Sequence, residues 1–126
     1  MAPEAFAREV ENAIAELPSE FREAVANVAV LVEEEPDAET MAEMGLAAPE
    51  ELLGLYRGVP MPNRGAFYAG AEPDRVSIYR RPILAEAERW DLDVADCVRN
   101  VLIHELGHYL GFDDEQLEAI EHGDEP

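Results

Sequence analysis

The sequence feature that most constrains the fold is the segment from Asp93 to Asp114, where a helical pattern runs into a cluster of polar residues. Its apolar side chains recur at helical spacing and are Val94, Val98, Val101 and Leu102. This spacing predicts a long helix with one buried face. Asp91 or Asp93 can cap its start, and Gly111 can end it because glycine adopts the left-handed conformation most easily. The rest of the chain must therefore supply a core against this helix.

Three residues with metal-binding or catalytic chemistry lie near the end of this predicted helix. His104 and His108 are four residues apart, so their Cβ atoms lie roughly 5–6 Å apart on one side of the helix and both imidazoles can bind one tetrahedral metal ion. Glu105 can then act as general base on a water molecule. The chain reversal at Gly111 can bring Asp114 back as a third ligand. Zinc is the preferred ion, because imidazole and carboxylate ligands suit it.

The third ligand has alternatives in the sequence. Asp114 can instead serve as the N-cap of a short helix predicted over residues 114–120. Other possible ligands follow in the chain and are Glu115, Glu118 and His122, whereas the adjacent Asp113 is expected to point elsewhere. The core pattern His-Glu-x-x-His also occurs by chance in helices. Here its histidines are two of only three in the chain, and a glycine and an acid follow at suitable offsets, which favours a metal site.

Four tyrosines are candidates for hydrogen bonding to an oxyanion. They are Tyr56, Tyr68, Tyr79 and Tyr109. We interpret each of them as a half-buried packing residue in preference to an oxyanion donor, since tyrosine combines a large apolar ring with one polar atom. The sequence does not choose between them.

The composition restricts the partners and the compartment. The net charge is −20, from 29 acidic and 9 basic residues, and every basic residue is arginine. A field of this sign repels nucleic acid and anionic lipid, so neither is an expected partner. An acidic surface can select basic or neutral peptides, but we interpret it as a solvated surface that favours solubility. The one cysteine, Cys97, excludes an internal disulfide. We interpret it as a small core residue rather than a reactive thiol.

The length of 126 residues predicts a single domain over residues 1–126 with a core of its own. The N-terminal residues show neither a basic region nor an apolar run typical of a signal peptide. No apolar stretch approaches the roughly 18 residues of a membrane span. We therefore expect a cytoplasmic protein that does not bind membranes.

Periodicity predicts the remaining elements. Residues 4–17 form an amphipathic helix, a short helical turn follows at 19–24, and the continuous β-branched run at 27–32 is typical of a strand buried on both faces. Alternation over residues 74–80 predicts a strand with one polar face, suited to a sheet edge. Residues 53–62 are apolar but broken by glycine and proline, which favours a packed loop. A weak helical pattern covers 83–90, and the acidic segment 36–54 is helix-tolerant without a defined structure.

Several of these segments together resemble the small bacterial zincin-like metallopeptidases. The matching stretches are ELPSEF, NVAVLVEEEP, LLGLYRGVPMP, PDRVSIYRRPI and, most specifically, VLIHELGHYLGFDDEQLEAI. The resemblance implies an α+β domain in which a small mixed sheet packs against an N-terminal helix and the motif helix. It also implies zinc bound by His104, His108 and Asp114, with Glu105 catalytic. Relatives often carry a further histidine where this chain has Tyr109.

Two functions are compatible with these observations. The first is a zinc-dependent metallopeptidase that hydrolyses a peptide or protein substrate, with the predicted edge strand at 75–80 pairing with the extended substrate backbone. The second is a metal-binding regulatory or interaction module, in which zinc is structural and no peptide is cut. The two differ in whether the metal retains an open coordination position.

Overall fold

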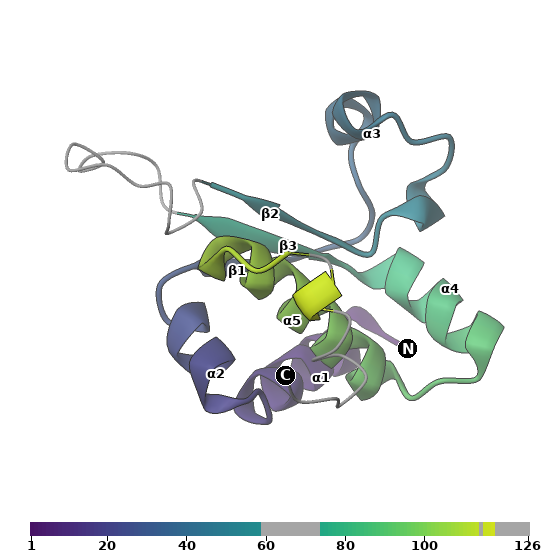
Figure 1. Ribbon diagram of the computed structural model, residues 1–126. Helices are drawn as coiled ribbons and strands as arrows, with labels where there is room; N and C mark the ends of the chain where they lie inside the picture. The colour runs from purple at the N-terminus through teal and green to yellow at the C-terminus, as the bar shows by residue number, and fades with distance from the viewer. Residues whose placement is uncertain (59–73, 114, 118–126) are drawn as a thin grey trace.

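The computed structural model describes residues 1–58, 74–113 and 115–117, and it confirms the predicted α+β fold. The elements, in chain order, are α1 (Pro3–Ala15), α2 (Ser19–Val25), β1 (Ala29–Glu33), α3 (Ala38–Met44), the short 3-10 helix η1 (Pro49–Glu51), β2 (Gly54–Arg57), β3 (Arg75–Tyr79), α4 (Arg80–Trp90) and α5 (Val94–Leu110). Figure 1 shows α1, α2 and α5 on one side of the sheet and α3 on the other. In this part of the chain, no helix is both long and apolar enough to span a bilayer.

The sheet is small and mixed, as predicted. Its strand order is β1-β3-β2. β1 runs parallel to β3, with Val30 opposite Val76, and β2 runs antiparallel to β3, with Tyr56 opposite Val76. β3 is therefore the central strand, with hydrogen-bonded neighbours on both sides.

This order reverses the positions predicted for two strands. The run at 27–32 was expected to be buried on both faces, yet β1 is an edge strand in which Leu31 and Val32 are each 42% exposed. The segment at 74–80 was expected at an edge, yet β3 is central, and Ser77 and Tyr79 on its more polar face are only 3% and 2% exposed. A strand between two neighbours has no free backbone edge, so β3 cannot pair with a substrate in the way proposed from the sequence.

The core lies between the sheet and the helices α1, α2 and α5. Val76 and Ile78 of β3 are fully buried, as are Val98 and Leu102 of α5 and Phe6 of α1. Cys97 belongs to the same buried cluster, which confirms its interpretation as a core residue. Burial is the main cause that raises the pKa of this thiol, so the thiolate is disfavoured.

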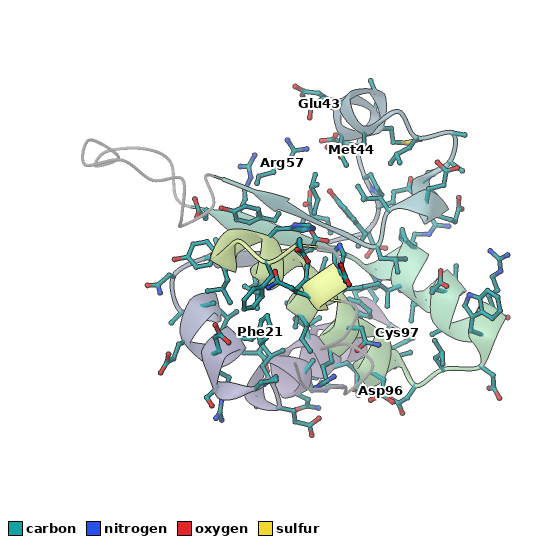
Figure 2. The ribbon with its side chains drawn as sticks, viewed as in Figure 1. Phe21, Glu43, Met44, Arg57, Asp96 and Cys97 are labelled. Carbon is teal, nitrogen blue, oxygen red and sulfur yellow. The ribbon has the colours of Figure 1, made fainter. Side chains whose placement is uncertain are left out.

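On the other side of the sheet, α3 is tied to β2 by side-chain contacts. Arg57 of β2 donates a 2.6 Å hydrogen bond to the buried Thr40 hydroxyl of α3 and forms a 3.3 Å ion pair with Glu43 (Figure 2). Asp37 caps α3 by accepting a hydrogen bond from the Thr40 amide. The acidic segment whose structure the sequence left open is thus a short, capped helix.

Two further predictions need correction in their bounds. The apolar segment predicted as a loop contains the regular strand β2 over Gly54–Arg57, and its part from 59 to 62 lies outside the described residues. The weak helix at 83–90 is confirmed as α4, which begins earlier, at Arg80. Pro82 is tolerated at its third position because the first amides of a helix have no intrahelical acceptor.

The start of α5 is fixed by one side-chain cap. Asp93 accepts a 2.8 Å hydrogen bond from the Ala95 amide, so Asp93 and not Asp91 is the cap. Replacing Asp93 by alanine should lower the free energy of unfolding by about 1 kcal/mol. Urea denaturation measures this difference. Asp93→Asn keeps the acceptor and should recover most of the loss, whereas equal losses in the two variants would contradict the capping role.

Candidate functional site

The last two turns of α5 bring the three motif side chains together. The His104 and His108 rings have centroids 4.7 Å apart and lie nearly perpendicular to each other. Possible ligand atoms of His104, Glu105 and His108 all lie within 4.8 Å of one another, and all three residues are half-buried. The predicted convergence of the two imidazoles and the carboxylate on one side of α5 therefore occurs.

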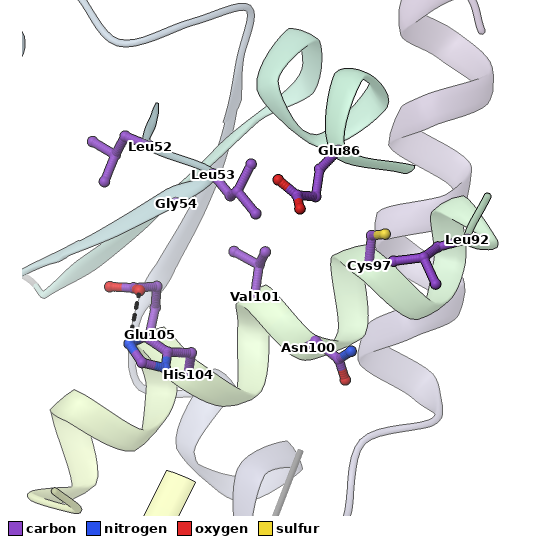
Figure 3. A pocket seen from close by; sticks show the side chains of 10 residues that line it. All are labelled: Leu52, Leu53, Gly54, Glu86, Leu92, Cys97, Asn100, Val101, His104 and Glu105. Atoms are coloured by element: carbon purple, nitrogen blue, oxygen red, sulfur yellow. Dashed lines mark ion pairs between the residues drawn. The ribbon is translucent and has the colours of Figure 1, made fainter. Parts of the chain in front are cut away.

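Glu105 is held between the sheet and the first histidine. Its Oε1 accepts a 2.8 Å hydrogen bond from the backbone amide of Tyr56 in β2. Its Oε2 lies 4.0 Å from His104 Nε2, the contact dashed in Figure 3. The Glu105 side chain is 12% exposed, against 37% for His104. One carboxylate oxygen is thus anchored by the strand, while the other faces the imidazole.

This anchor depends on a close approach of β2 to α5 at Gly54. A Cβ placed on Gly54 would lie 2.5 Å from Val101 Cγ1 and 3.0 Å from the Ser77 backbone oxygen, with Glu105 Cγ at 3.5 Å. No real side chain fits there without moving the strand or the helix. Glycine at this position therefore allows the Tyr56 amide to reach Glu105.

Replacing Gly54 by alanine should destabilise the protein by about 1–3 kcal/mol, because the added methyl overpacks the contact between β2 and α5. Urea denaturation gives the loss. The matched double variant Gly54→Ala/Val101→Ala removes the nearest clashing atom, and its loss should be smaller than the sum of the two single losses by at least about 0.5 kcal/mol. Strict additivity would show that the contact is not tight.

The chain reverses after the motif as predicted. Gly111 has a left-handed φ of 88°, and its amide bonds back to the His108 carbonyl oxygen. Asp113 then caps the following turn: its side chain accepts from the Gln116 amide, and its own amide donates to the Gln116 side chain. The cap that the sequence offered to Asp114 is therefore filled by Asp113. Asp114, the predicted third ligand, lies outside the described residues, as do Glu118 and His122.

A second glycine on α5 lets this returning segment lie directly on the helix. Leu117 is fully buried, and a Cβ on Gly107 would lie 2.0 Å from Leu117 Cδ2. Residues 115–117 are helical, and Glu115, an alternative ligand, is exposed. Leu117 thus packs on α5 at Gly107, the residue before His108.

The structure assigns packing contacts to three of the four tyrosines. Tyr56 donates a 3.0 Å hydrogen bond from its phenol to the buried Asp74, and its ring meets Tyr109 edge-on at 6.1 Å. Tyr109 is itself buried. Tyr79 is buried in β3, and desolvation is the main cause that raises the pKa of its phenol. Tyr68 lies outside the described residues.

A cavity of about 370 Å³ opens beside the motif, between α5, α4 and β2. Figure 3 shows it from close by, with Glu86 of α4 reaching toward the gap between Leu53 and Val101. Its lining residues are Leu52, Leu53, Gly54, Glu86, Leu92, Cys97, Asn100, Val101, His104 and Glu105. A hollow of this size next to two histidines and a carboxylate is suited to a substrate side chain.

Sequence reasoning missed the contributions of β2 and α4 to this site. The Tyr56 amide is a backbone donor, which no residue pattern reveals, and it lies 49 positions from Glu105. Gly54 carried a signal, an isolated glycine in an apolar segment, which is typical of a close backbone approach. Glu86 is one of many acids and had no distinguishing signal.

The donor set fits zinc. The two imidazoles supply nitrogen ligands of the kind that zinc accepts, and the Glu105 carboxylate lies in the same small, half-buried volume, within reach of a water molecule beside the metal.

Comparison with known proteins agrees with this arrangement. A search of curated proteins finds no significant match. The family model described as zincin-like metallopeptidase matches residues 25–124, from the end of α2 through the motif. This match covers most of the chain and includes the sheet, both helices that line the cavity and the two histidines. The chain therefore belongs to the zincin-like metallopeptidase family.

Proposed function

We propose that this protein is a zinc-dependent peptidase in which His104, His108 and Asp114 bind the metal and Glu105 is the general base. The family supports a metallopeptidase with a zinc cofactor. The residue roles are supported by the cluster of His104, Glu105 and His108 on one side of α5. Asp114 is proposed because the chain returns toward the histidines through the Gly111 turn and the Asp113 cap.

The observation that carries the proposal is the divided environment of Glu105. Here the Tyr56 amide takes one oxygen, and the other faces His104 at 4.0 Å. The strand thus fixes the carboxylate beside the imidazoles, where the general base of this mechanism must lie.

In the proposed reaction, the metal and the residues of the chain have separate roles. Zinc bound by these residues supplies a Lewis acid that acidifies water and polarises a carbonyl group. Glu105 Oε2 accepts the proton of the attacking water and passes it to the leaving amine, so that the carboxylate is regenerated. The Tyr56 amide keeps the carboxylate in one orientation through both transfers.

An extended peptide is the substrate that the sheet suits. β2 is an edge strand that pairs with β3 on one side, and in the described part of the chain no strand lies on its other side. It also contacts Glu105 through its own backbone. A peptide that paired with backbone groups of β2 other than the Tyr56 amide, in place of the central strand β3, would bring its scissile bond past the general base.

Zinc binding and peptide cleavage test the proposal. Purified protein should bind zinc at one ion per chain, and His104→Ala and His108→Ala should each reduce this ratio strongly at equal free zinc. The zinc-loaded protein should cut members of a random peptide library, with products identified by mass spectrometry. Full zinc occupancy in both histidine variants would contradict the ligand assignment, and an uncut library would contradict the peptidase.

A further inference from the structure

We infer that the cavity beside the motif selects a long basic side chain of the substrate, arginine or lysine, and that Glu86 is the specificity-determining residue. The inference rests on the proposed peptidase function and names the class of peptide it acts on. It is carried by the position of the Glu86 carboxylate, which reaches from α4 into an otherwise largely apolar cavity.

The walls of the cavity suit an aliphatic stem. Leu53 of β2's leading segment, Val101 of α5 and Leu92 from the turn before α5 line it, and Leu52 and Cys97 add further apolar surface. The methylene groups of arginine or lysine can lie along such walls while the charged end reaches a polar partner. At about 370 Å³ the cavity is large enough for a long side chain.

The charge inside the cavity has one sign. Glu86 points from α4 toward the space above Val101, and Glu105 borders the other end (Figure 3). No arginine is among the lining residues, and the chain has no lysine. Among the described residues, the Glu86 carboxylate makes no hydrogen bond or ion pair. The walls around this half-buried carboxylate are apolar, so a cationic side chain would provide the hydrogen-bond donor and the opposite charge that the walls lack.

The Cys97 thiol also lines the cavity and lies close enough to Glu86 for its charge to act on it. Cys97 is buried, and after burial itself the negative charge of Glu86 is the next cause that raises the pKa of this thiol. The Glu86 carboxylate therefore acts on the interior of the cavity as well as on the surface of α4.

Acidic and apolar substrate side chains fit this negatively charged cavity less well than basic ones. An acidic side chain would meet Glu86 and Glu105 as like charges. A purely apolar side chain would cover the Glu86 carboxylate without providing a hydrogen-bond donor, which penalises it. A basic side chain buries its stem against the leucines and pairs its charge with Glu86, so it is favoured over both.

Cleavage of matched peptides tests the inference. Zinc-loaded protein is given peptides of one sequence with arginine, lysine, citrulline, leucine or glutamate at each position next to the cut bond. At one of these positions, the peptide with arginine should be cleaved with a kcat/KM about five- to tenfold higher than the peptide with citrulline. The two side chains differ mainly in charge, so this ratio measures the effect of the charge. Glu86→Gln should abolish this ratio, and Glu86→Arg should invert it in favour of glutamate. Glu88→Gln, which removes a carboxylate from the exposed side of α4, should leave the ratio unchanged.

A binding measurement separates this inference from the proposed function. N-acetyl-arginine amide should shift the NMR methyl signals of Leu53, Leu92 and Val101, and N-acetyl-citrulline amide should shift them far less. Glu86→Gln should remove the difference. This measurement needs no turnover, so it reports on the cavity alone.

The outcomes are distinct. Cleavage that shows no preference for arginine, or a preference that survives in Glu86→Gln, would overturn the inference and leave the peptidase standing. Arginine-dependent shifts at the three methyls without cleavage of any peptide would support the cavity and contradict the peptidase. The absence of both effects would overturn the inference.

Discussion

Replacing Glu105 by glutamine should lower the kcat/KM of the zinc-loaded protein by about 10²–10⁴-fold, the usual contribution of a general base. Glutamine has nearly the same size, and its amide oxygen can still accept from the Tyr56 amide, so the packing of β2 on α5 is kept. It cannot accept and return a proton. The loss should therefore appear in the chemical step, and it is measured by steady-state cleavage of a fluorogenic peptide.

Two measurements accompany this variant. The zinc content of Glu105→Gln should match that of the unaltered protein, because the proposed ligands are intact. Glu88→Gln removes the same charge, but from the exposed side of α4, and it should retain full activity. Unchanged turnover in Glu105→Gln would remove Glu105 from the mechanism, and a parallel loss of zinc would make it a ligand instead of a base.

Removal of the metal by a chelator should abolish cleavage while the chain stays folded. The buried core of α1, α2, α5 and β3 is built from apolar side chains, none of which belongs to the proposed ligand set. The two histidines are half-buried at the edge of this core. Far-ultraviolet circular dichroism should therefore change little on chelation, and added zinc should restore activity.

This experiment also decides between the peptidase and the module with structural zinc. A structural site contributes directly to folding, so its loss unfolds the domain. Cooperative unfolding on chelation, together with a failure to cut any peptide after zinc is returned, would favour the module. Retained structure with reversible loss of activity would favour the peptidase.

The helices could be predicted from the sequence because their apolar spacing is a local property. Phe6, Val10 and Ala13 form the buried stripe of α1, and Val98, Val101 and Leu102 form that of α5. The end of α5 at Gly111 was also predictable, since a left-handed residue after a helix favours glycine.

The strand positions could not be predicted, because they depend on which strands become neighbours. The run of β-branched residues in β1 is typical of a buried strand, yet only Val30 of β1 is even half-buried. The alternation in β3 is typical of an edge, yet Ser77 is covered because β1 and β2 flank it and α3 lies over that side of the sheet. Local patterns report side-chain preference, and burial of a strand is set by long-range pairing.

The parts of the site that could be predicted are those whose residues lie close together in the sequence. The convergence of His104, Glu105 and His108 follows from helical geometry alone. The single-domain organisation and the role of Asp114 stay predictions. The Tyr56 anchor and Glu86 come from segments distant in sequence, so only the folded chain reveals them.

The sequence separation of 49 positions between Tyr56 and Glu105 makes the metal ligands and the general base differ in their sensitivity to loosening of the fold. All the proposed metal ligands lie between positions 104 and 114, so their assembly closes only a short loop and is largely complete once α5 and its turn form. The orientation of the base requires β2 to be docked across Gly54. As temperature or denaturant loosens the sheet, metal retention should therefore outlast turnover, and a protein that still holds its zinc can already have lost its catalytic alignment.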